Sequence, residues 1–205
     1  GMLAGMRWGM LISESGHDFW SEIKQGWEYG EILDVITTPQ GWIYGSGRQG
    51  ADVLDPGRTD WTPLLLEGYT NELLRHADGT LLASTWPGVL RSTDDGRSWD
   101  SLILGYNQST FLIEDARGVV YTGIVDSLVY RSSDAGATWL AGKTWIPRDE
   151  VLGAAYADGS IFLFTKNLGL YRVDTALTAA EQLFTADAVG YSYVFTMSGR
   201  EDIIA

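Results

Sequence analysis

The chain has no cysteine and only two histidines, His17 and His76, among its 205 residues. Without cysteine it forms neither a disulfide nor a thiol nucleophile, and the two histidines stand in unrelated sequence contexts. Cysteine-based zinc or iron–sulfur sites and histidine-rich metal sites are therefore excluded. We expect no metal site and no cofactor.

Positive charge is also scarce. The 14 lysines and arginines face 27 acidic residues, which leaves a net charge of −13. This balance argues against binding to a nucleic-acid backbone or to an anionic membrane surface. No apolar run reaches the roughly 18 residues that a membrane-spanning helix needs. Residues 1–7 lack the basic segment and long apolar stretch of a secretion signal, so no signal peptide is expected in this chain.

What the chain does contain is a repeat of about forty residues. Residues 89–99 and 129–139 both read Ser-x-Asp-x-Gly-x-Ser/Thr-Trp, and their serines, Ser92 and Ser132, lie 40 positions apart. Three further segments lie at the same spacing but are degenerate: residues 53–61, 13–20 and 170–174. Residues 170–174 keep only the strand that leads into the motif and lose the motif itself.

A glycine between two short apolar runs recurs in phase with the motif. The runs are rich in β-branched and aromatic residues, which favours strands, and residues 175–183 are only a weak helix candidate. Each repeat therefore predicts four strands, a to d, with the glycine in the a–b turn and the motif in the c–d turn. The glycines are Gly41, Gly79, Gly118, Gly159 and Gly199.

Four short antiparallel strands per repeat, repeated radially, are typical of a β-propeller. We predict an all-β fold and a single five-bladed β-propeller of four-stranded antiparallel blades. Residues 2–13 align without gaps on residues 81–92, so the chain would begin at strand b, and residues 191–199 would supply the missing strand a and close the ring. The predicted blades are residues 31–70, 71–107, 108–149, 150–186, and 187–205 joined to 1–30.

One alternative stays open for the ring. Residues 203–205 also look like a strand b and would duplicate residues 2–4. The chain would then be part of a six- or seven-bladed ring. Far-UV circular dichroism with a strong helical signal would contradict either form of the propeller.

The Ser-x-Asp-x-Gly-x-x-Trp motif resembles the Asp-box, or BNR repeat, of sialidases and related propellers. We expect the aspartate to accept backbone hydrogen bonds in the c–d turn, the glycine to permit the turn, and the tryptophan to pack between sheets. The resemblance also favours an extracellular or periplasmic location. The residues assigned to this structural role are Ser92, Asp94, Gly96 and Trp99, with Ser132, Asp134, Gly136 and Trp139.

In a propeller the c–d turns lie on one face and the b–c and d–a loops on the other, so a binding site is expected on the second face. Every d–a loop carries an aromatic residue. These rings would either stack on sugars or pack blade against blade. The ligand-binding candidates are Arg7, Trp8, Tyr29, Arg48, Tyr69, Trp86, Tyr106, Asp126, Trp145, Arg148 and Tyr191.

The leading functional hypothesis is a non-catalytic propeller that binds a glycan through these aromatic residues. A glycoside hydrolase of sialidase-like type and a protein-interaction platform are the alternatives. The Arg-Ile-Pro motif of sialidases is missing, so no catalytic residue carries over from that family. A hydrolase with two opposed carboxylates would have to draw them from Glu31, Glu67, Asp126, Asp149 or Glu150.

Three arginines of the loop face, Arg7, Arg48 and Arg148, would meet if the ring closes. Together they would grip a carboxylate or sulfate and favour acidic glycans in a salt-dependent way. Alternatively, each arginine pairs with a local acid, such as Asp149 beside Arg148.

Two acids, Asp34 and Glu72, occupy the same position of strand a and would face the channel of the ring. They would either hold a cation or remain hydrated. Two carboxylates alone do not make a calcium site.

Overall fold

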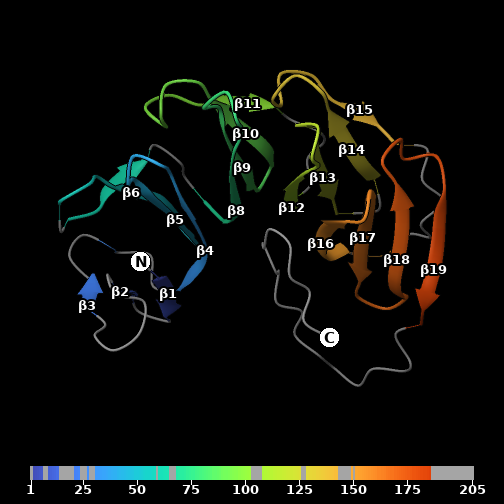
Figure 1. The fold of residues 1–205 in the computed structure, drawn as a ribbon, viewed down its shortest axis with the longest axis horizontal. Coiled ribbons are helices and arrows are strands. Elements are labelled where there is room, and N and C mark those ends of the chain that lie inside the picture. Colours follow the sequence, from blue (N-terminus) through green and yellow to red (C-terminus); the bar gives the residue numbers. More distant parts are fainter. Residues whose placement is uncertain are drawn as a thin grey trace. The chain divides into compact units, whose positions relative to one another are not determined.

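The computed structural model describes residues 2–6, 9–13, 21–23, 27, 31–58, 60–64, 68–102, 108–125, 128–142, 149 and 151–185 (Figure 1). All regular structure in these residues is β-strand. No helix long and apolar enough to cross a membrane occurs in this part of the chain. The chain divides into two compact units, Gly1–Ser109 and Thr110–Ala205.

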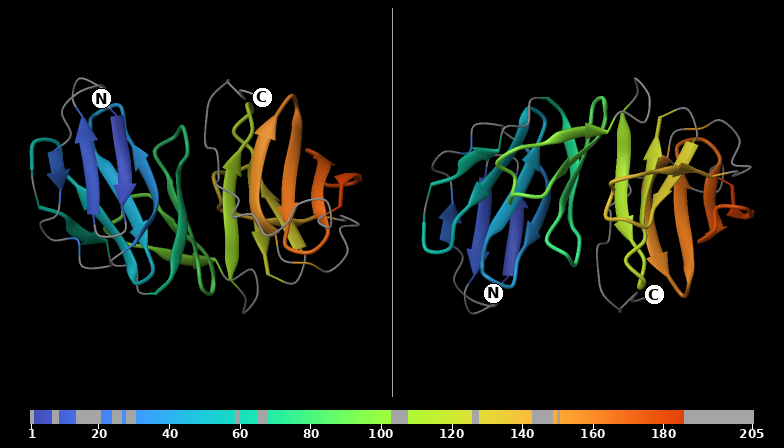
Figure 2. Two further views of the ribbon diagram at one scale, coloured as in Figure 1. Left: turned by 90° about the horizontal axis from the view of Figure 1, so that it is seen from below. Right: turned by 90° about the horizontal axis from the view of Figure 1, so that it is seen from above.

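The first unit holds three antiparallel sheets, in each of which the strands lie side by side in chain order (Figure 2). Blade 1 contains β1 (Met2–Met6), β2 (Gly9–Ser13) and β3 (Ser21–Ile23). Blade 2 contains β4 (Ile32–Thr37), β5 (Ile43–Gly47), β6 (Gly50–Leu54) and β7 (Thr62–Leu64). Blade 3 contains β8 (Thr70–Arg75), β9 (Leu81–Thr85), β10 (Gly88–Ser92) and β11 (Asp100–Leu102).

The second unit holds two four-stranded sheets with the same strand order. Blade 4 contains β12 (Ser109–Glu114), β13 (Val120–Ile124), β14 (Leu128–Ser132) and β15 (Leu140–Ala141). Blade 5 contains β16 (Val151–Ala157), β17 (Ser160–Thr165), β18 (Gly169–Asp174) and β19 (Ala180–Phe184).

The predicted pattern of four short antiparallel strands per repeat is confirmed in blades 2 to 5. Blade 1 begins at strand b: Met2 pairs with Ser13 as Leu81 pairs with Ser92, which is the ungapped alignment found in the sequence. Residues 191–199 and 203–205 lie outside the described residues, so closure of the ring stays a prediction. The weak helix candidate at residues 175–183 is wrong, because this segment forms a turn and most of β19.

The a–b turns explain the recurring glycines. Gly41, Gly79 and Gly118 have φ angles of +88°, +95° and +80°, and Gly159 has +72°. A side chain is unfavourable in this left-handed region, whereas glycine enters it freely. In the first three turns the glycine amide donates to the carbonyl oxygen three residues earlier, at 2.9–3.0 Å. Gly199 lies outside the described residues.

The buried core lies between neighbouring sheets within each unit. In the first unit, Tyr44 and Leu64 of blade 2 form one apolar cluster with Leu73 and Leu81 of blade 3. In the second unit, fully buried side chains of blades 4 and 5 form another cluster, among them Phe111, Tyr121, Ile161, Leu163 and Leu177. Packing of one sheet on its neighbour therefore stabilises blades 2 and 3 in the first unit and blades 4 and 5 in the second.

Candidate functional site

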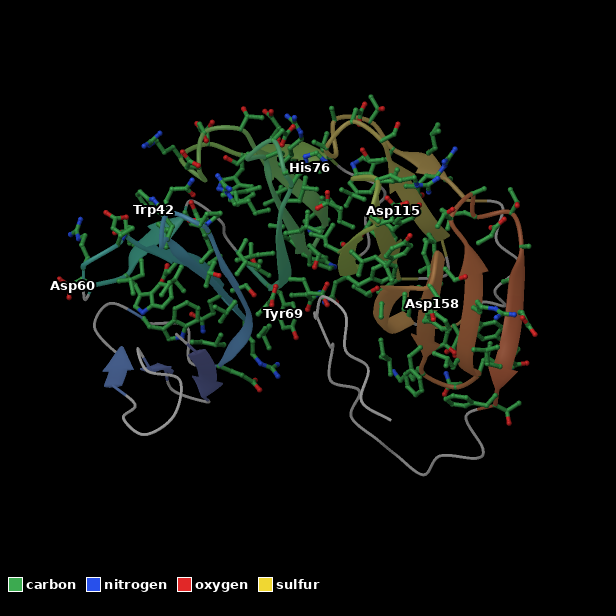
Figure 3. The ribbon with its side chains drawn as sticks, in the orientation of Figure 1. Trp42, Asp60, Tyr69, His76, Asp115 and Asp158 are labelled. Atoms are coloured by element: carbon green, nitrogen blue, oxygen red, sulfur yellow. The ribbon has the colours of Figure 1, made fainter. Side chains whose placement is uncertain are left out.

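The turns of a blade lie at its two opposite ends. Among the described residues, the a–b and c–d turns lie at one end of a sheet, and the b–c turns lie at the other end with the residues that precede strand a. Figure 3 shows His76 and Tyr69 at these opposite ends of β8. We call the end that carries Tyr69 the loop face.

The c–d turn of blade 3 is held together by its own polar side chains. The Ser92 hydroxyl donates to Asp94 Oδ1 at 2.8 Å and accepts the Gly96 amide at 2.9 Å. Asp94 also accepts the amide and hydroxyl of Ser98, at 2.9 and 2.6 Å. The Trp99 ring donates from Nε1 to the Gly96 carbonyl oxygen at 3.0 Å and packs on the core between blades 2 and 3.

Blade 4 repeats these bonds. The Ser132 hydroxyl donates to Asp134 Oδ1 at 2.7 Å and accepts the Gly136 amide at 2.8 Å. Asp134 accepts the amide and hydroxyl of Thr138 at 2.8 and 2.6 Å. Trp139 is half-buried, and its Nε1 has no hydrogen-bond partner among the described residues. In both turns the aspartate carboxylate accepts its hydrogen bonds from groups of the same turn.

The fifth copy of the motif, in blade 5, keeps more of the motif's hydrogen bonds than its sequence indicates. Asp174 accepts the amide of Thr178 at 2.6 Å and its hydroxyl at 2.5 Å, as Asp134 does with Thr138. The prediction that this repeat loses the motif was therefore wrong for the Asp–Thr pair. Arg172 stands in place of the serine, and the buried Leu177 packs against Gly142 of blade 4.

These turns predict a loss of stability in acid. The pKa values of Asp94 and Asp134 are lowered from 3.8 to about 2. For Asp94 the main cause is the Ser98 hydroxyl; for Asp134 burial acts upward, but the hydrogen bonds from Thr138 outweigh it. A carboxyl whose pKa is lower in the folded state stabilises the fold above its unfolded pKa and loses that contribution as pH falls through the folded pKa.

We therefore expect the free energy of unfolding to fall between about pH 4 and about pH 2. Urea denaturation at stepped pH measures this slope. The double variant Asp94→Asn/Asp134→Asn should show a shallower decline. An unchanged slope in that variant would contradict the assignment.

A second cluster lies on the loop face of the first unit. Arg48, in the b–c turn of blade 2, donates from Nε to Glu31 Oε2 at 3.0 Å. Its guanidinium carbon also lies 5.8 Å from the centre of the Tyr69 ring, within reach of a cation–π interaction. The hydrogen bond to Glu31 raises the pKa of Arg48. Both charged side chains are exposed.

Trp86 lies beside this cluster, in the b–c turn of blade 3. Its backbone amide donates to the Tyr69 carbonyl oxygen at 3.2 Å. The same turn is braced by the Thr85 hydroxyl, which donates to the Gly88 carbonyl oxygen at 3.2 Å. The Trp86 side chain is 60% exposed. An aromatic platform is thus presented to solvent from an anchored backbone.

These contacts share a pattern that our sequence analysis missed. In three blades a residue one or two positions before strand a holds the b–c turn of the same blade: Glu31 binds Arg48, Tyr69 binds Trp86, and Asp149 binds Asn167. Asp149 accepts the amide and side-chain NH₂ of Asn167, both at 2.7 Å, and the Leu168 amide at 2.9 Å. The sequence signal is a separation of 17 or 18 residues between polar groups.

Asp34, predicted to face the channel, bonds between two blades. Its carboxylate accepts the amides of Val35 and Leu73, both at 2.8 Å, and so joins β4 to β8. Burial raises its pKa. Among the described residues no group of three or more histidines and acidic residues is placed to hold a metal ion.

No family model and no curated protein matches the chain. Solved structures do. The extracellular domain of BT4673 from B. thetaiotaomicron matches with a TM-score of 0.73 and 11% identity over 89% of this chain. An ancestral GH74 enzyme matches with a TM-score of 0.70 and 16% identity over 88% of this chain. YCF48 bound to D1 peptide matches with a TM-score of 0.64 and 19% identity over 87% of this chain. The chain is a β-propeller.

The propeller spans only part of the length of these structures: 26% of the BT4673 domain, 29% of the GH74 enzyme and 62% of YCF48. At identities below 20% the similarity establishes the fold, and function must be argued from the site.

Of the predicted ligand-binding residues, Arg48, Tyr69 and Trp86 are described, and the propeller brings all three together on one loop face. Arg48 pairs with a local acid, which is the alternative that the sequence left open for it. The remaining candidates lie outside the described residues: Arg7, Trp8, Tyr29, Tyr106, Asp126, Trp145, Arg148 and Tyr191.

Proposed function

We propose that this β-propeller is a non-catalytic binding protein that holds a glycan on its loop face by stacking it on Trp86. The observation that carries the proposal is the 60% exposure of this indole on a turn held by two hydrogen bonds. Large aromatic side chains are normally buried, and an exposed one on a braced turn is suited to contact a ligand.

The chemistry of a sugar fits this surface. One face of a pyranose ring presents C–H groups, which pack on a flat aromatic ring, and its edge presents hydroxyl groups. The cluster that Trp86 joins through its backbone also contains the Arg48 guanidinium and the Tyr69 side chain, whose N–H and O–H groups are able to hydrogen-bond a sugar hydroxyl. Aromatic anchors with polar neighbours are also the groups that dominate binding energy at other interfaces.

The two loop-face carboxylates among the described residues, Glu31 and Asp149, are held in structural contacts, which supports binding over catalysis. Glu31 is paired with Arg48, and Asp149 accepts three hydrogen bonds. A glycosidase of the usual kind needs two carboxyl groups that face each other across the glycosidic bond. Glycoside hydrolysis remains the second candidate because the GH74 enzyme shares the fold.

A protein-interaction platform is the third candidate, and the peptide complex of YCF48 favours it. An exposed tryptophan beside an arginine also suits a peptide partner. The same set of measurements separates the three candidates. Glycan binding without turnover supports the proposal, turnover of chromogenic glycosides supports a hydrolase, and silence in both assays supports a protein partner.

We expect Trp86→Ala to weaken binding of a glycan identified on an array about 30-fold or more. This is the loss of about 2 kcal/mol that defines an aromatic hot spot. Titration calorimetry measures it. The matched control is Phe184→Ala on β19, where the aromatic side chain is 39% exposed, and its affinity should equal that of the wild type. Unchanged binding by Trp86→Ala would contradict the proposal.

A second proposal concerns the c–d turns and the fold. We propose that they are Asp-box turns, that their Ser, Asp, Gly and Trp residues are structural, and that the sheets belong to one five-bladed ring. The hydrogen bonds of Ser92, Asp94 and Gly96 support the first two statements, and their repetition at Ser132 and Asp134 adds to that support. A crystal structure with another blade count would contradict the third.

A further inference from the structure

The guanidinium group of Arg48 makes two contacts on the loop face. Its Nε bonds the Glu31 carboxylate, and its carbon lies 5.8 Å from the centre of the Tyr69 ring. Glu31 lies just before β4 and Tyr69 just before β8, so the two contacts tie the entry of blade 2 to the entry of blade 3. Arg48 therefore positions Tyr69, whose carbonyl oxygen in turn holds the amide of Trp86.

This arrangement leaves no net positive charge on the Glu31–Arg48 pair. An acidic sugar that bound the Nη groups of Arg48 would meet the negative charge of Glu31, which is bonded to Nε of the same guanidinium. The net charge of −13 further disfavours an approaching anion.

We infer that the glycan bound beside Trp86 is uncharged, and that Glu31 sets this selectivity by neutralising the positive charge of Arg48. The inference rests on the proposed function. It reverses the preference for acidic glycans that the sequence suggested, because that preference required Arg48 to be available together with Arg7 and Arg148. The indole of Trp86 recognises the apolar face of the sugar, and no ionic contact is needed.

The test compares one neutral oligosaccharide with its sulfated counterpart at low salt, by calorimetry on the full chain. The wild type should bind the neutral form more tightly. Glu31→Gln keeps the shape of the side chain but removes its charge, so the positive charge of Arg48 is no longer neutralised. We expect the neutral-to-sulfated affinity ratio to fall about tenfold or more, the value of a hydrogen bond to a charged group.

The matched control is Glu181→Gln, which removes the charge from an equally exposed pair with Arg172 on blade 5. Its affinity ratio should equal that of the wild type. Tighter binding of the sulfated sugar by the wild type, or an unchanged ratio in Glu31→Gln, would overturn the inference while leaving the proposed function intact. Binding of neither sugar would contradict the proposed function and the inference with it.

Discussion

Trp99→Ala is expected to lower the free energy of unfolding by about 3 kcal/mol, the lower end of the usual cost of deleting a large aromatic side chain, because Trp99 is half-buried. Trp99 packs against the cluster that joins blades 2 and 3, and its Nε1 donates to the Gly96 carbonyl oxygen at 3.0 Å. A Cβ placed on Gly96 would lie 2.7 Å from Leu64 Cδ2, so the turn is already pressed against blade 2. The alanine variant would leave a gap that this tight turn cannot fill.

Trp86→Ala provides the control within the same blade. Its indole is largely exposed, and substitutions of this kind usually change stability by no more than about 0.5 kcal/mol. Urea denaturation followed by fluorescence measures both variants. The two tryptophans thus separate folding from binding. Full stability of Trp99→Ala combined with lost glycan binding would place Trp99 in the site and contradict the structural assignment.

Asp115→Ala is expected to cost about 1–3 kcal/mol, because it leaves the buried Tyr121 hydroxyl and the turn amides without their acceptor, whereas the exposed Arg117 side chain is hydrated. The carboxylate is fully buried and accepts hydrogen bonds from the Arg117 side chain at 2.6 and 3.1 Å, from the Val119 amide at 3.0 Å and from the Tyr121 hydroxyl at 3.1 Å. Burial alone acts to raise the pKa of Asp115, but the bonds from Arg117 and Val119 lower it, so the group is charged at neutral pH.

The Asp115 network also joins two blades. The Tyr121 hydroxyl reaches the Thr175 carbonyl oxygen of blade 5 at 3.0 Å, and burial together with Asp115 raises the pKa of Tyr121 to about 12. Tyr121→Phe should therefore cost about 1 kcal/mol, the net value of a hydrogen bond.

The control is Asp78→Ala, in the corresponding turn of blade 3, where the carboxylate is exposed and the cost should stay below about 1 kcal/mol. An equal loss of unfolding free energy in Asp115→Ala and Asp78→Ala would show that burial of the carboxylate does not contribute to stability.

Much of the fold was predictable because its signals are local. The hydrogen bonds of the c–d turns join residues two to four positions apart, as Ser92 to Asp94 and Gly96. The a–b turns need glycine at one position because of its positive φ angle. Such constraints act on a few neighbouring residues, so they recur in the sequence at the period of the blade.

Part of the site was predictable for the same reason. The b–c and d–a segments follow from the strand pattern, which placed Arg48, Tyr69 and Trp86 on one face. Their partners did not follow, because residues 17 positions apart meet only through the register of strands a and b. The Asp174–Thr178 pair was missed for another reason: its residues are only four positions apart, but the serine and tryptophan that mark the motif are absent.

The sequence by itself determined the strands, their turns and the four-stranded sheet, since each depends on neighbouring residues and on a regular period. Only the tertiary structure decided which polar groups are engaged and which ring is exposed. Asp34 meets the Leu73 amide 39 residues away, and Tyr121 meets Thr175 54 residues away. These contacts depend on how one sheet packs on the next, which no local pattern encodes. The same packing holds Trp99 against the core, whereas the indole of Trp86 remains in solvent.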